Sequence, residues 1–473
     1  MEPRSRSFYR NSEKSLADAP LQAAISRTTG RFVGTRAASV EAFPGFEFAR
    51  HEGSRIKGET LDRLDRYLAL FIAEAEKRGA VVHAARDGAE ARKIAVAIAQ
   101  QEGIRLAVKS KSMVAEEVEL NEALEAAGVE VVESDLGEFI IQLAGEPPSH
   151  IIAPAVHKTR EQVSRLFEEK LGEPYTDRIP ELVRIARKHL RGKFLAAGMG
   201  ISGANFLCAD TGSVVLVTNE GNGRMGTILP RVHLVVASIE KVIPRMADLP
   251  VFLRLLPRSA TGQVISTYVS LLTGTRRPGD PEGPEKLHIL LVDNGRSGIL
   301  QGKYREILKC IRCGACLNIC PVYQSVGGHA YGWVYSGPMG SVLTPLLTGL
   351  AEGAPLPNAS TLCGACAEVC PVKIPLPELL VELRADERDR GLKNPAEVLG
   401  MKGYAAVMHR AGILEALERM IGVLSQLFFK DGKVSWLPFK LSGWTGKRDF
   451  PAPASQPFRR LWKKQRGIRP WNR

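Results

Sequence analysis

Seven of the eight cysteines in this 473-residue chain lie in two short runs. The first run, over residues 310–321, has the spacing C-x2-C-x2-C-x3-C-P, and the second, over residues 363–371, repeats it from the second cysteine onward. Bacterial two-cluster ferredoxins have this spacing. Three thiolates on a tight turn reach three corners of one cubane, whereas the fourth, at the start of a helix, points to the other cluster. The two runs therefore predict two iron–sulfur clusters.

The position of the fourth thiolate predicts that ligation crosses between the runs. Three cysteines of the first run and the last of the second would hold the first cluster: Cys310, Cys313, Cys316 and Cys370. The remaining three would hold the second cluster: Cys320, Cys363 and Cys366. We expect both to be four-iron clusters, with a three-iron form as the alternative for the second.

The second cluster lacks one cysteine, because Ser360 stands where the spacing requires the first cysteine of the second run. Three thiolates suit a three-iron cluster, or a four-iron cluster whose last iron binds serine, water or an atom of a partner. The sequence leaves these alternatives open. Zinc is a weaker interpretation, since it is mostly held by two separated C-x2-C pairs. Disulfides are weaker still, because a chain of this length can build a large core without them.

The overall composition is that of an ordinary globular protein, with 44% hydrophobic and 24% charged residues. No apolar run follows the charged N-terminus, so we expect no signal peptide. No stretch reaches eighteen consecutive apolar residues, which argues against a membrane-spanning helix. We therefore expect a cytoplasmic protein, in a compartment where thiolates stay reduced.

The basic charge is concentrated in the C-terminal region. Residues 391–473 contain 16 Lys and Arg but only 5 Asp and Glu, out of a net charge of +13 for the chain. The region also contains an amphipathic stretch at residues 413–429 and four tryptophans, Trp436, Trp444, Trp462 and Trp471. Such a tail can contact anionic lipid or an acidic partner subunit. It can equally be a packed helix with a solvated arm; nucleic acid is the least favoured partner, because no recognised binding motif is present.

Helical and strand patterns alternate between residues 60 and 300. Strand patterns are expected at residues 80–84, 105–109, 129–133, 213–218, 232–238 and 287–292, and helical patterns at residues 61–78, 89–102 and 116–127. This alternation predicts an α/β domain with a largely parallel sheet. The cysteine region has few β-branched runs and is expected to be a helical ferredoxin domain. The predicted division is an N-terminal arm at 1–59, the α/β domain at 60–300, the ferredoxin domain at 301–390 and the basic region at 391–473.

Several segments outside the cysteine runs resemble one protein family. They are residues 109–113, 133–143, 148–152, 203–212, 218–225, 293–296 and 327–331. Together with the cysteines, and in the same order, they are similar to lactate utilization protein B, the iron–sulfur subunit of a three-component bacterial L-lactate oxidation system. The resemblance implies an α/β fold shared with ribose-5-phosphate isomerase and CoA transferases. It also implies two partners, a cysteine-rich subunit and a smaller subunit with the same α/β fold. The family's second run likewise offers three cysteines.

A candidate anion pocket is predicted in the α/β domain. The glycine-rich stretch at residues 198–205 lets backbone N–H groups approach an anion, and Lys109, Lys111 and Arg224 are cations suited to a small carboxylate or phosphate. Asn219 and Glu220 follow a strand directly, where α/β folds often place active-site groups. The competing interpretation is structural turns with solvated lysines. By analogy with CoA transferases, Glu220 can also be a nucleophile, although an ordinary tight turn explains the residues as well.

These patterns favour an electron-transfer subunit that relays electrons from lactate oxidation, lactate to pyruvate, through two clusters. The alternative is a CoA-transferase-like or isomerase-like enzyme whose clusters are structural. Neither a flavin nor a nicotinamide motif is visible, so the sequence does not indicate the immediate electron acceptor.

Overall fold

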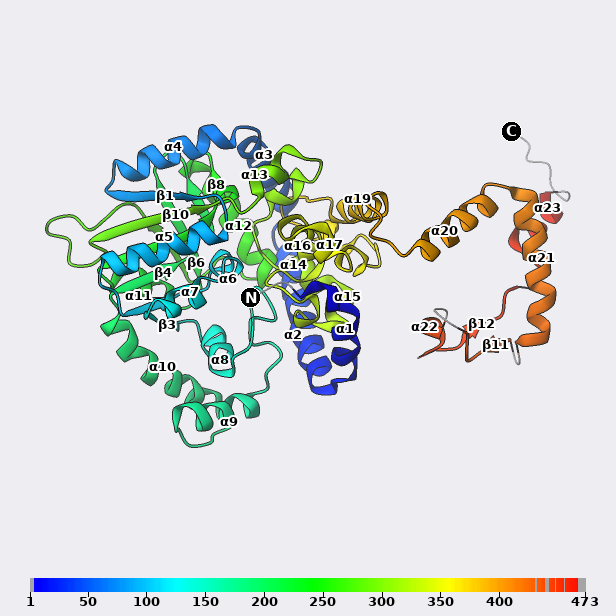
Figure 1. Ribbon diagram of the computed structural model, residues 1–473, viewed down its shortest axis with the longest axis horizontal. Helices are drawn as coiled ribbons and strands as arrows, with labels where there is room; N and C mark the ends of the chain where they lie inside the picture. The colour runs from blue at the N-terminus through cyan, green and yellow to red at the C-terminus, as the bar shows by residue number, and fades with distance from the viewer. Residues whose placement is uncertain (1–3, 430–431, 439–441, 447, 455, 467–473) are drawn as a thin grey trace. The chain divides into compact units, whose positions relative to one another are not determined.

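The computed structural model describes residues 4–429, 432–438, 442–446, 448–454 and 456–466 (Figure 1). The chain divides into two compact units, Met1–Glu387 and Arg388–Arg473. The first unit contains the predicted α/β and cysteine regions, and the second contains the basic C-terminal region.

A six-stranded sheet forms the centre of the first unit, with the strand order β1-β10-β7-β4-β2-β3. Every pairing between neighbouring strands is parallel. The strands are β1 (Ala80–Ala85), β2 (Leu106–Lys109), β3 (Glu130–Glu133), β4 (Met199–Ser202), β7 (Val232–Ser238) and β10 (Lys286–Val292). All seven residues of β7 are buried, as expected for a parallel strand covered on both faces. The prediction of an α/β region with a parallel sheet is confirmed.

Helices cover both faces of this sheet (Figure 1). The apolar side chains of one face pack with α5 (Gly88–Gln101), α6 (Met113–Glu117) and α7 (Leu120–Ala126). The helix predicted at residues 116–127 is wrong as a single element, because Glu119 has a left-handed φ of 56° between α6 and α7. Further helices complete the layers: α4 (Leu64–Glu76), α8 (Leu136–Ala144), α9 (Arg160–Leu171), α10 (Ile179–Ala196), α11 (Asn222–Ile228), α12 (Leu249–Ala260) and α13 (Arg296–Gln301).

A second, four-stranded sheet has the order β8-β5-β6-β9. Its strands are β5 (Phe206–Cys208), β6 (Ser213–Thr218), β8 (Val242–Ile243) and β9 (Tyr268–Leu272). β5 and β6 form an antiparallel hairpin whose turn contains Gly212, at φ 62°. A Cβ at Gly212 would lie 2.3 Å from the Ala75 backbone nitrogen of α4, so this turn requires glycine both for its conformation and for its close packing.

The cysteine region contains only helices between residues 301 and 387, all of which the structure describes. They are η4 (Arg305–Lys309), α14 (Ala315–Ile319), α15 (Pro321–Val326), η5 (His329–Tyr331), α16 (Gly337–Thr348), α17 (Leu350–Gly353), η6 (Leu356–Asn358), α18 (Ala365–Glu368) and α19 (Leu376–Asp389). The N-terminal residues are also helical, with η1 (Ser5–Ser7), α1 (Phe8–Ala17), α2 (Ala19–Glu41) and α3 (Phe46–Asp62). α2 packs against both α14 and α15, so the predicted N-terminal arm is part of the wall around the cysteines.

One hydrophobic core joins the α/β and cysteine regions. Its buried members include Ile56, Phe206 and Phe252 from one side and Leu343 and Leu380 from the other. The predicted division at residue 300 falls inside this shared core, where Leu300 is partly buried. The cysteine region is therefore held rigidly against the α/β region.

Two of the segments that carry the family resemblance, residues 148–152 and 327–331, are largely buried and pack on each other. Tyr323 donates its hydroxyl hydrogen to the Ser149 carbonyl oxygen at 2.8 Å, and His150 Nε2 donates to Asn318 Oδ1 at 3.0 Å. A Cβ at Gly328 would lie 1.7 Å from the Ser149 carbonyl oxygen, so only glycine permits this approach. The segments at residues 148–152 and 327–331 thus belong to one contact between the α/β and cysteine regions.

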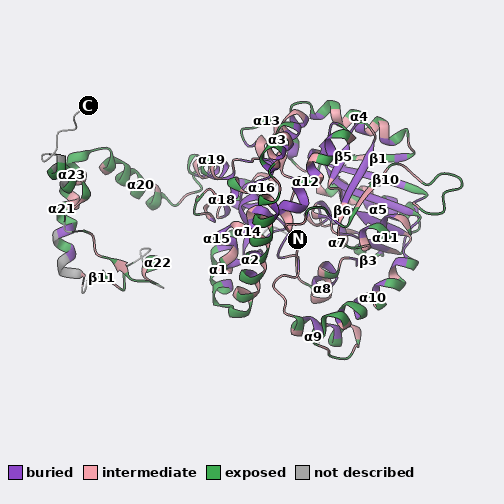
Figure 2. Cartoon of the chain, turned by 180° about the vertical axis from the view of Figure 1, so that it is seen from behind, coloured by how far each residue is buried: buried purple, intermediate pink, exposed green. Residues whose placement is uncertain are grey.

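In its described residues, the second unit contains helices and a two-stranded sheet. Its elements are α20 (Pro395–Met408), α21 (Ala411–Phe428), β11 (Lys433–Val434), α22 (Ser442–Thr445), β12 (Phe450–Pro451) and α23 (Phe458–Arg466). The side chains of α20 are mostly exposed (Figure 2), and Trp436 is 68% exposed. Trp471 lies outside the described residues. Within the part of the chain that the structure describes, no helix has the length and apolar character needed to cross a membrane.

Candidate functional site

The two cysteine runs adopt the same backbone conformation. Both contain the sequence Cys-Gly-Ala-Cys, at residues 313–316 and 363–366. Arg312 and Leu362, which precede these segments, have left-handed φ values of 59° and 55°, and Gly314 and Gly364 follow with 75° and 87°. α14 and α18 then begin directly after these glycines. Left-handed φ values are costly for non-glycine residues, so their repetition marks a constrained loop.

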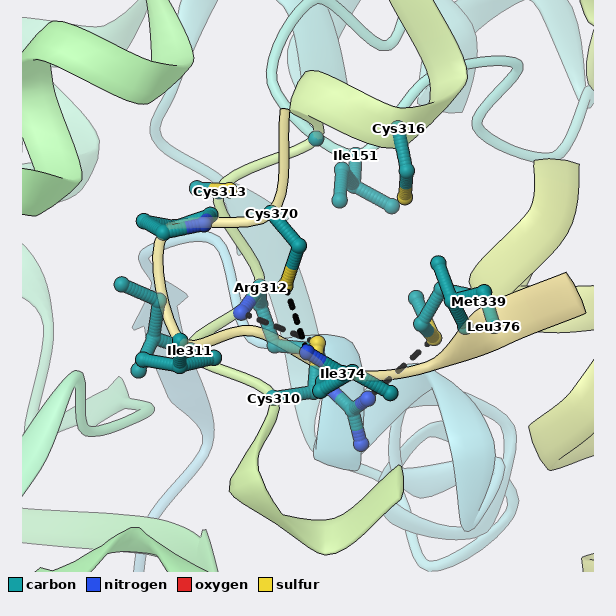
Figure 3. Close-up of a pocket in the computed structure, with 13 residues that line it drawn as sticks. Ile151, Cys310, Ile311, Arg312, Cys313, Cys316, Met339, Cys370, Ile374 and Leu376 are labelled. Atoms are coloured by element: carbon teal, nitrogen blue, oxygen red, sulfur yellow. Dashed lines mark hydrogen bonds between the residues drawn. The ribbon is translucent and has the colours of Figure 1, made fainter. Parts of the chain in front are cut away.

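Four thiols line one cavity next to the α/β region, and they are the four predicted for the first cluster: Cys310, Cys313, Cys316 and Cys370 (Figure 3). Apolar side chains such as Ile151 and Met339 complete the lining. The Arg312 backbone N–H donates to Cys310 Sγ at 3.4 Å, and the Ile374 N–H donates to Cys370 Sγ at 3.3 Å. Thus the last cysteine of the second run lies with the first three of the first run.

The three thiols predicted for the second cluster act on one another electrostatically. The pKa of the Cys366 thiol is raised to about 12, mainly by burial and then by the charge of Cys320. Cys363 is exposed, and a backbone hydrogen bond from Ala365 lowers the pKa of its thiol. The second group therefore reaches the surface, in contrast to the first.

Ser360 lies in the turn that precedes Cys363. Its Oγ accepts a hydrogen bond from the Leu362 backbone N–H at 3.1 Å, and its carbonyl oxygen accepts one from Arg384 at 3.0 Å. The hydroxyl thus has a local backbone partner. Ligation by Ser360 stays a prediction.

The chemistry of the first group fits an iron–sulfur cluster. Thiolates are the soft ligands that such clusters use, and N–H groups directed at sulfur stabilise the negative charge of the bound cluster. Burial raises the pKa of the Cys313 and Cys316 thiols, so binding would release their protons. Among the described residues, no three His, Cys, Asp or Glu side chains form a group that could hold a single metal ion.

A buried chain of charges leads from the α/β region to the first cysteine group. Arg296 Nη2 lies 2.6 Å from Glu117 Oε2, and Arg296 Nε lies 2.9 Å from Glu240 Oε2. Arg312 Nη2 then lies 3.3 Å from Glu240 Oε1. Burial alone would raise the pKa of Glu240, but the guanidinium groups of Arg296 and Arg312 hold this pKa at about 2. Tyr335 donates its hydroxyl hydrogen to Glu117 at 2.5 Å and completes the network.

Two buried lysines lie near Cys310, and burial lowers the pKa of one of them, Lys57, to about 7. Lys57 is fully buried and donates to the Glu240 carbonyl oxygen. Burial and the neighbouring Arg312 lower the pKa of Lys241 to about 8. Sequence reasoning did not select Glu117, Glu240 or Lys241. The sequence signal for Glu240 and Lys241 was a pair of adjacent charged residues inside the mostly apolar stretch 232–243.

The structure separates the residues of the predicted anion pocket. Lys109 is fully buried, and its ammonium group lies 2.7 Å from both Glu116 and Glu133, so its charge is already matched. Arg224 is exposed and does not line a cavity with the others. Lys111, Asn219 and Glu220 do line a common cavity of about 420 Å³.

The glycine-rich stretch at residues 198–205, predicted to approach an anion, includes the strand β4. A Cβ at Gly200 would lie 1.7 Å from the Gly226 carbonyl oxygen, so this glycine allows α11 to approach the sheet. Only the end of the stretch, Gly203 to Asn205, lines the cavity. The close packing of α11 therefore explains the glycine at position 200. Within this stretch, only the residues after β4 line the cavity.

Comparison with protein families matches three parts of the chain. Residues 68–292 match the LUD domain, residues 306–374 match the 4Fe-4S dicluster domain, and residues 386–467 match the C-terminal domain of lactate utilisation protein B. Lactate utilization protein B of Bacillus subtilis is 44% identical over 93% of this chain and 92% of its own length. The chain belongs to the lactate utilization protein B family. The predicted resemblance is confirmed, as is the prediction of iron–sulfur clusters.

Other relatives have similar identity. Lactate utilization protein B of Shouchella clausii is 42% identical over 96% of both chains, and that of Oceanobacillus iheyensis is 43% identical over 97% of this chain and 96% of its own. A solved structure of a DUF162 family protein from Deinococcus radiodurans covers 48% of this chain and 98% of its own, with 13% identity and a TM-score of 0.28. This low score carries no conclusion about the fold.

Proposed function

We propose that the protein is the iron–sulfur electron-transfer subunit of a system that oxidises L-lactate to pyruvate. The observation that carries the proposal is the position of Cys370 among the first three cysteines of the other run, in a chain of the lactate utilization protein B family. This arrangement supports crossed ligation and hence two cluster sites. When bound, iron–sulfur clusters accept and release single electrons.

The two sites differ in their surroundings. The first group would be held by Cys310, Cys313, Cys316 and Cys370, beside the buried charges of the α/β region. The second would be held by Cys320, Cys363 and Cys366, of which Cys363 is exposed. An exposed ligand brings the second site within reach of a partner, whereas the first adjoins the α/β region.

Two subunits are proposed as partners, a cysteine-rich protein and a smaller protein with the same α/β fold. The membrane-surface role of the basic C-terminal region is likewise a proposal, supported by its charge and by exposed Trp436 and Trp444. The proposed fold relationship to ribose-5-phosphate isomerase and CoA transferases is supported by the parallel sheet alone.

The alternative is an enzyme that uses Glu220 as a nucleophile. One observation favours it, since Glu220 lines the 420 Å³ cavity. However, partial burial and the neighbouring Asp135 raise the pKa of Glu220, which lowers the ionised fraction that a nucleophile needs. Electron transfer is therefore the better-supported function.

Anaerobic reconstitution tests the proposal. We expect roughly seven or eight iron atoms per chain, the number for two four-iron clusters or one four-iron and one three-iron cluster. Dithionite should bleach the visible absorbance and air should restore it. Lactate should produce the same bleaching only when all three subunits are present. Stoichiometric zinc, or clusters that do not respond to dithionite, would contradict the proposal.

A further inference from the structure

The cavity that contains Lys111, Asn219 and Glu220 lies at the carboxyl edge of the parallel sheet. Its lining includes Ser110 to Met113 after β2, Asp135 after β3, Gly203 to Asn205 after β4 and Lys241 after β7. Because parallel strands all end at the same edge, these four segments meet there, and α/β proteins commonly bind ligands at this edge. The location therefore indicates a ligand site.

The cavity also adjoins the first cysteine group. Ile151 and Arg312 line both this cavity and the cavity that contains Cys310, Cys313, Cys316 and Cys370. Arg312 lies between Cys310 and Cys313 in the chain. A ligand in the 420 Å³ cavity would therefore be separated from the first cluster site by only one layer of side chains.

Lys241 is the residue of the lining that most strongly indicates an anionic ligand. Its side chain is only 8% exposed, and its ammonium group makes no hydrogen bond or ion pair with any residue that the structure describes. A buried charge without a partner is costly, because water no longer solvates it. Glu240 does not match it, since that carboxylate already pairs with Arg296 and Arg312. The charge of Cys310 acts favourably on Lys241, but it acts on Arg312 as well.

Other residues of the lining have acceptor character. Glu220 and Asp135 act on each other electrostatically there, with Lys111 as a nearby cation. Lys111 Nζ lies 2.9 Å from Glu138 Oε1, but this buried nitrogen makes no hydrogen bond and burial raises the pKa of Glu138 to about 8, so Lys111 is a second cation available to a ligand. The buried Asn222 Oδ1 has no hydrogen-bond partner. A ligand with hydrogen-bond donors would satisfy these oxygens.

Other polar groups of the lining are held in place by each other. Asn219 Nδ2 donates to Gln263 Oε1 at 2.9 Å, and Thr261 Oγ1 donates to the same oxygen at 2.7 Å. Such a network fixes the side-chain orientations before any ligand binds, which lowers the entropic cost of binding. The volume of about 420 Å³ lies within the range of roughly 300–1,000 Å³ found for small-molecule sites.

We propose that this cavity binds a polar organic anion, with its carboxylate or phosphate at Lys241 and its hydrogen-bond donors toward Glu220 and Asn222. The inference extends the proposed function, because it places the bound molecule beside the first cluster site. Two sources have this chemistry, a small hydroxy acid and a larger phosphate-bearing carrier. Binding itself requires no electron transfer, so a test of binding is independent of the relay.

Isothermal titration calorimetry on the anaerobically reconstituted full chain tests the proposal. The probes are two matched pairs, L-lactate with lactamide and flavin mononucleotide with riboflavin, because the members of each pair differ in the anionic group. We expect the anion of at least one pair to bind with about one site per chain and more tightly than its neutral counterpart. The pair that responds identifies the source.

Three variants locate the site. Lys241→Met should weaken the binding of the anion at least tenfold and remove the difference within the pair. Ala260→Phe places a larger side chain in the cavity without changing charge and should also weaken binding. Lys93→Met, at an exposed position on α5, makes the same change in net charge and should bind as the wild type does. No binding of any probe by the wild type, or unchanged binding in both Lys241→Met and Ala260→Phe, would overturn the proposal.

Discussion

Arg312 Nη2 lies 3.3 Å from Glu240 Oε1, and this contact joins the first cysteine run to the segment that follows β7. The same guanidinium lies over the Tyr335 ring, 4.8 Å from its centroid, and makes a favourable cation–π interaction with it. Arg312 also occupies the left-handed position next to Cys313. One side chain thus contributes to the loop conformation, to the domain contact and to the charge near Cys310.

Crossed ligation predicts which cluster each cysteine variant loses. Cys370→Ala should remove the first cluster, although Cys370 belongs to the second run, because its thiol lies with Cys310, Cys313 and Cys316. Cys320→Ala is the matched variant and should affect the second cluster. Iron analysis and electron paramagnetic resonance of the reduced proteins measure both effects. If Cys370→Ala loses only the signal of the second cluster, the assignment is wrong.

Removal of positive charge beside Cys310 should lower the reduction potential of the first cluster. Arg312→Gln removes a buried cation that favours the more negative, reduced state. A redox titration followed by electron paramagnetic resonance should show a lower midpoint for the first cluster and an unchanged midpoint for the second. Arg384→Gln is the control variant. It should leave the midpoint of the first cluster unchanged, because Arg384 donates to the Pro357 and Ser360 carbonyl oxygens and not to groups beside Cys310. A shift of both clusters in Arg312→Gln would indicate a general loosening of the fold.

The Ser360 position should control oxidation of the second cluster. Mild oxidation should convert this cluster in the wild type to a three-iron form with its own paramagnetic signal, while the first stays intact. Ser360→Cys should suppress the conversion, because a thiolate is a softer ligand for iron than a hydroxyl. Identical behaviour of the wild type and Ser360→Cys would remove Ser360 from the site. Its Oγ would then act only as the acceptor for the Leu362 N–H.

Acidification should destabilise the protein through His150. Burial lowers the pKa of His150 to about 4, and its Nδ1 accepts hydrogen bonds from the Ile152 and Ala153 N–H groups. Between the unfolded pKa of about 6.5 and the folded value, only the unfolded state binds the proton, so stability falls as the pH decreases. The expected loss between pH 7 and pH 5 is about 2 kcal/mol.

Thermal unfolding of the wild type and His150→Gln at these two pH values measures this contribution. The variant lacks the titrating ring, so its stability should depend less on pH, even if it is less stable at pH 7. An equal pH dependence in both proteins would show that His150 does not stay neutral in the folded state.

Truncation after Glu387 should leave both clusters assembled, because every predicted ligand lies in the first compact unit. It should weaken association with partner subunits or with vesicles that contain anionic lipid. Salt should weaken the same association in the full-length protein, since exposed charges are screened over roughly 8–10 Å at physiological ionic strength. Unchanged sedimentation with partners and vesicles would mean that the basic region has no docking role.

Much of the fold was accessible from local patterns. The strands predicted at residues 213–218 and 232–238 coincide with β6 and β7, because continuous β-branched and leucine runs leave little ambiguity. The helix predicted at residues 116–127 failed at Glu119, whose left-handed conformation has no signal in hydrophobic periodicity. The N-terminal helices α1 to α3 were also missed, because the apolar periodicity of the long helix α2 is weak and their packing on the cysteine region is a tertiary effect.

The cysteine spacing alone determined the iron–sulfur chemistry, because a cluster requires several soft ligands at fixed separations along a short loop. Family identity was equally accessible, from residue patterns in a constant order. Only the tertiary structure showed that Lys109 is neutralised by Glu116 and Glu133, whereas Lys241 has no such partner among the described residues. Lys109 is the last residue of β2, whereas Lys241 ends the short helix η2 (Ile239–Lys241) that follows β7. The local sequence does not show which of the two ammonium groups pairs with carboxylates. The difference arises because Glu116 and Glu133 both approach the ammonium group of Lys109, whereas no carboxylate pairs with that of Lys241 among the described residues, and only the folded packing decides this.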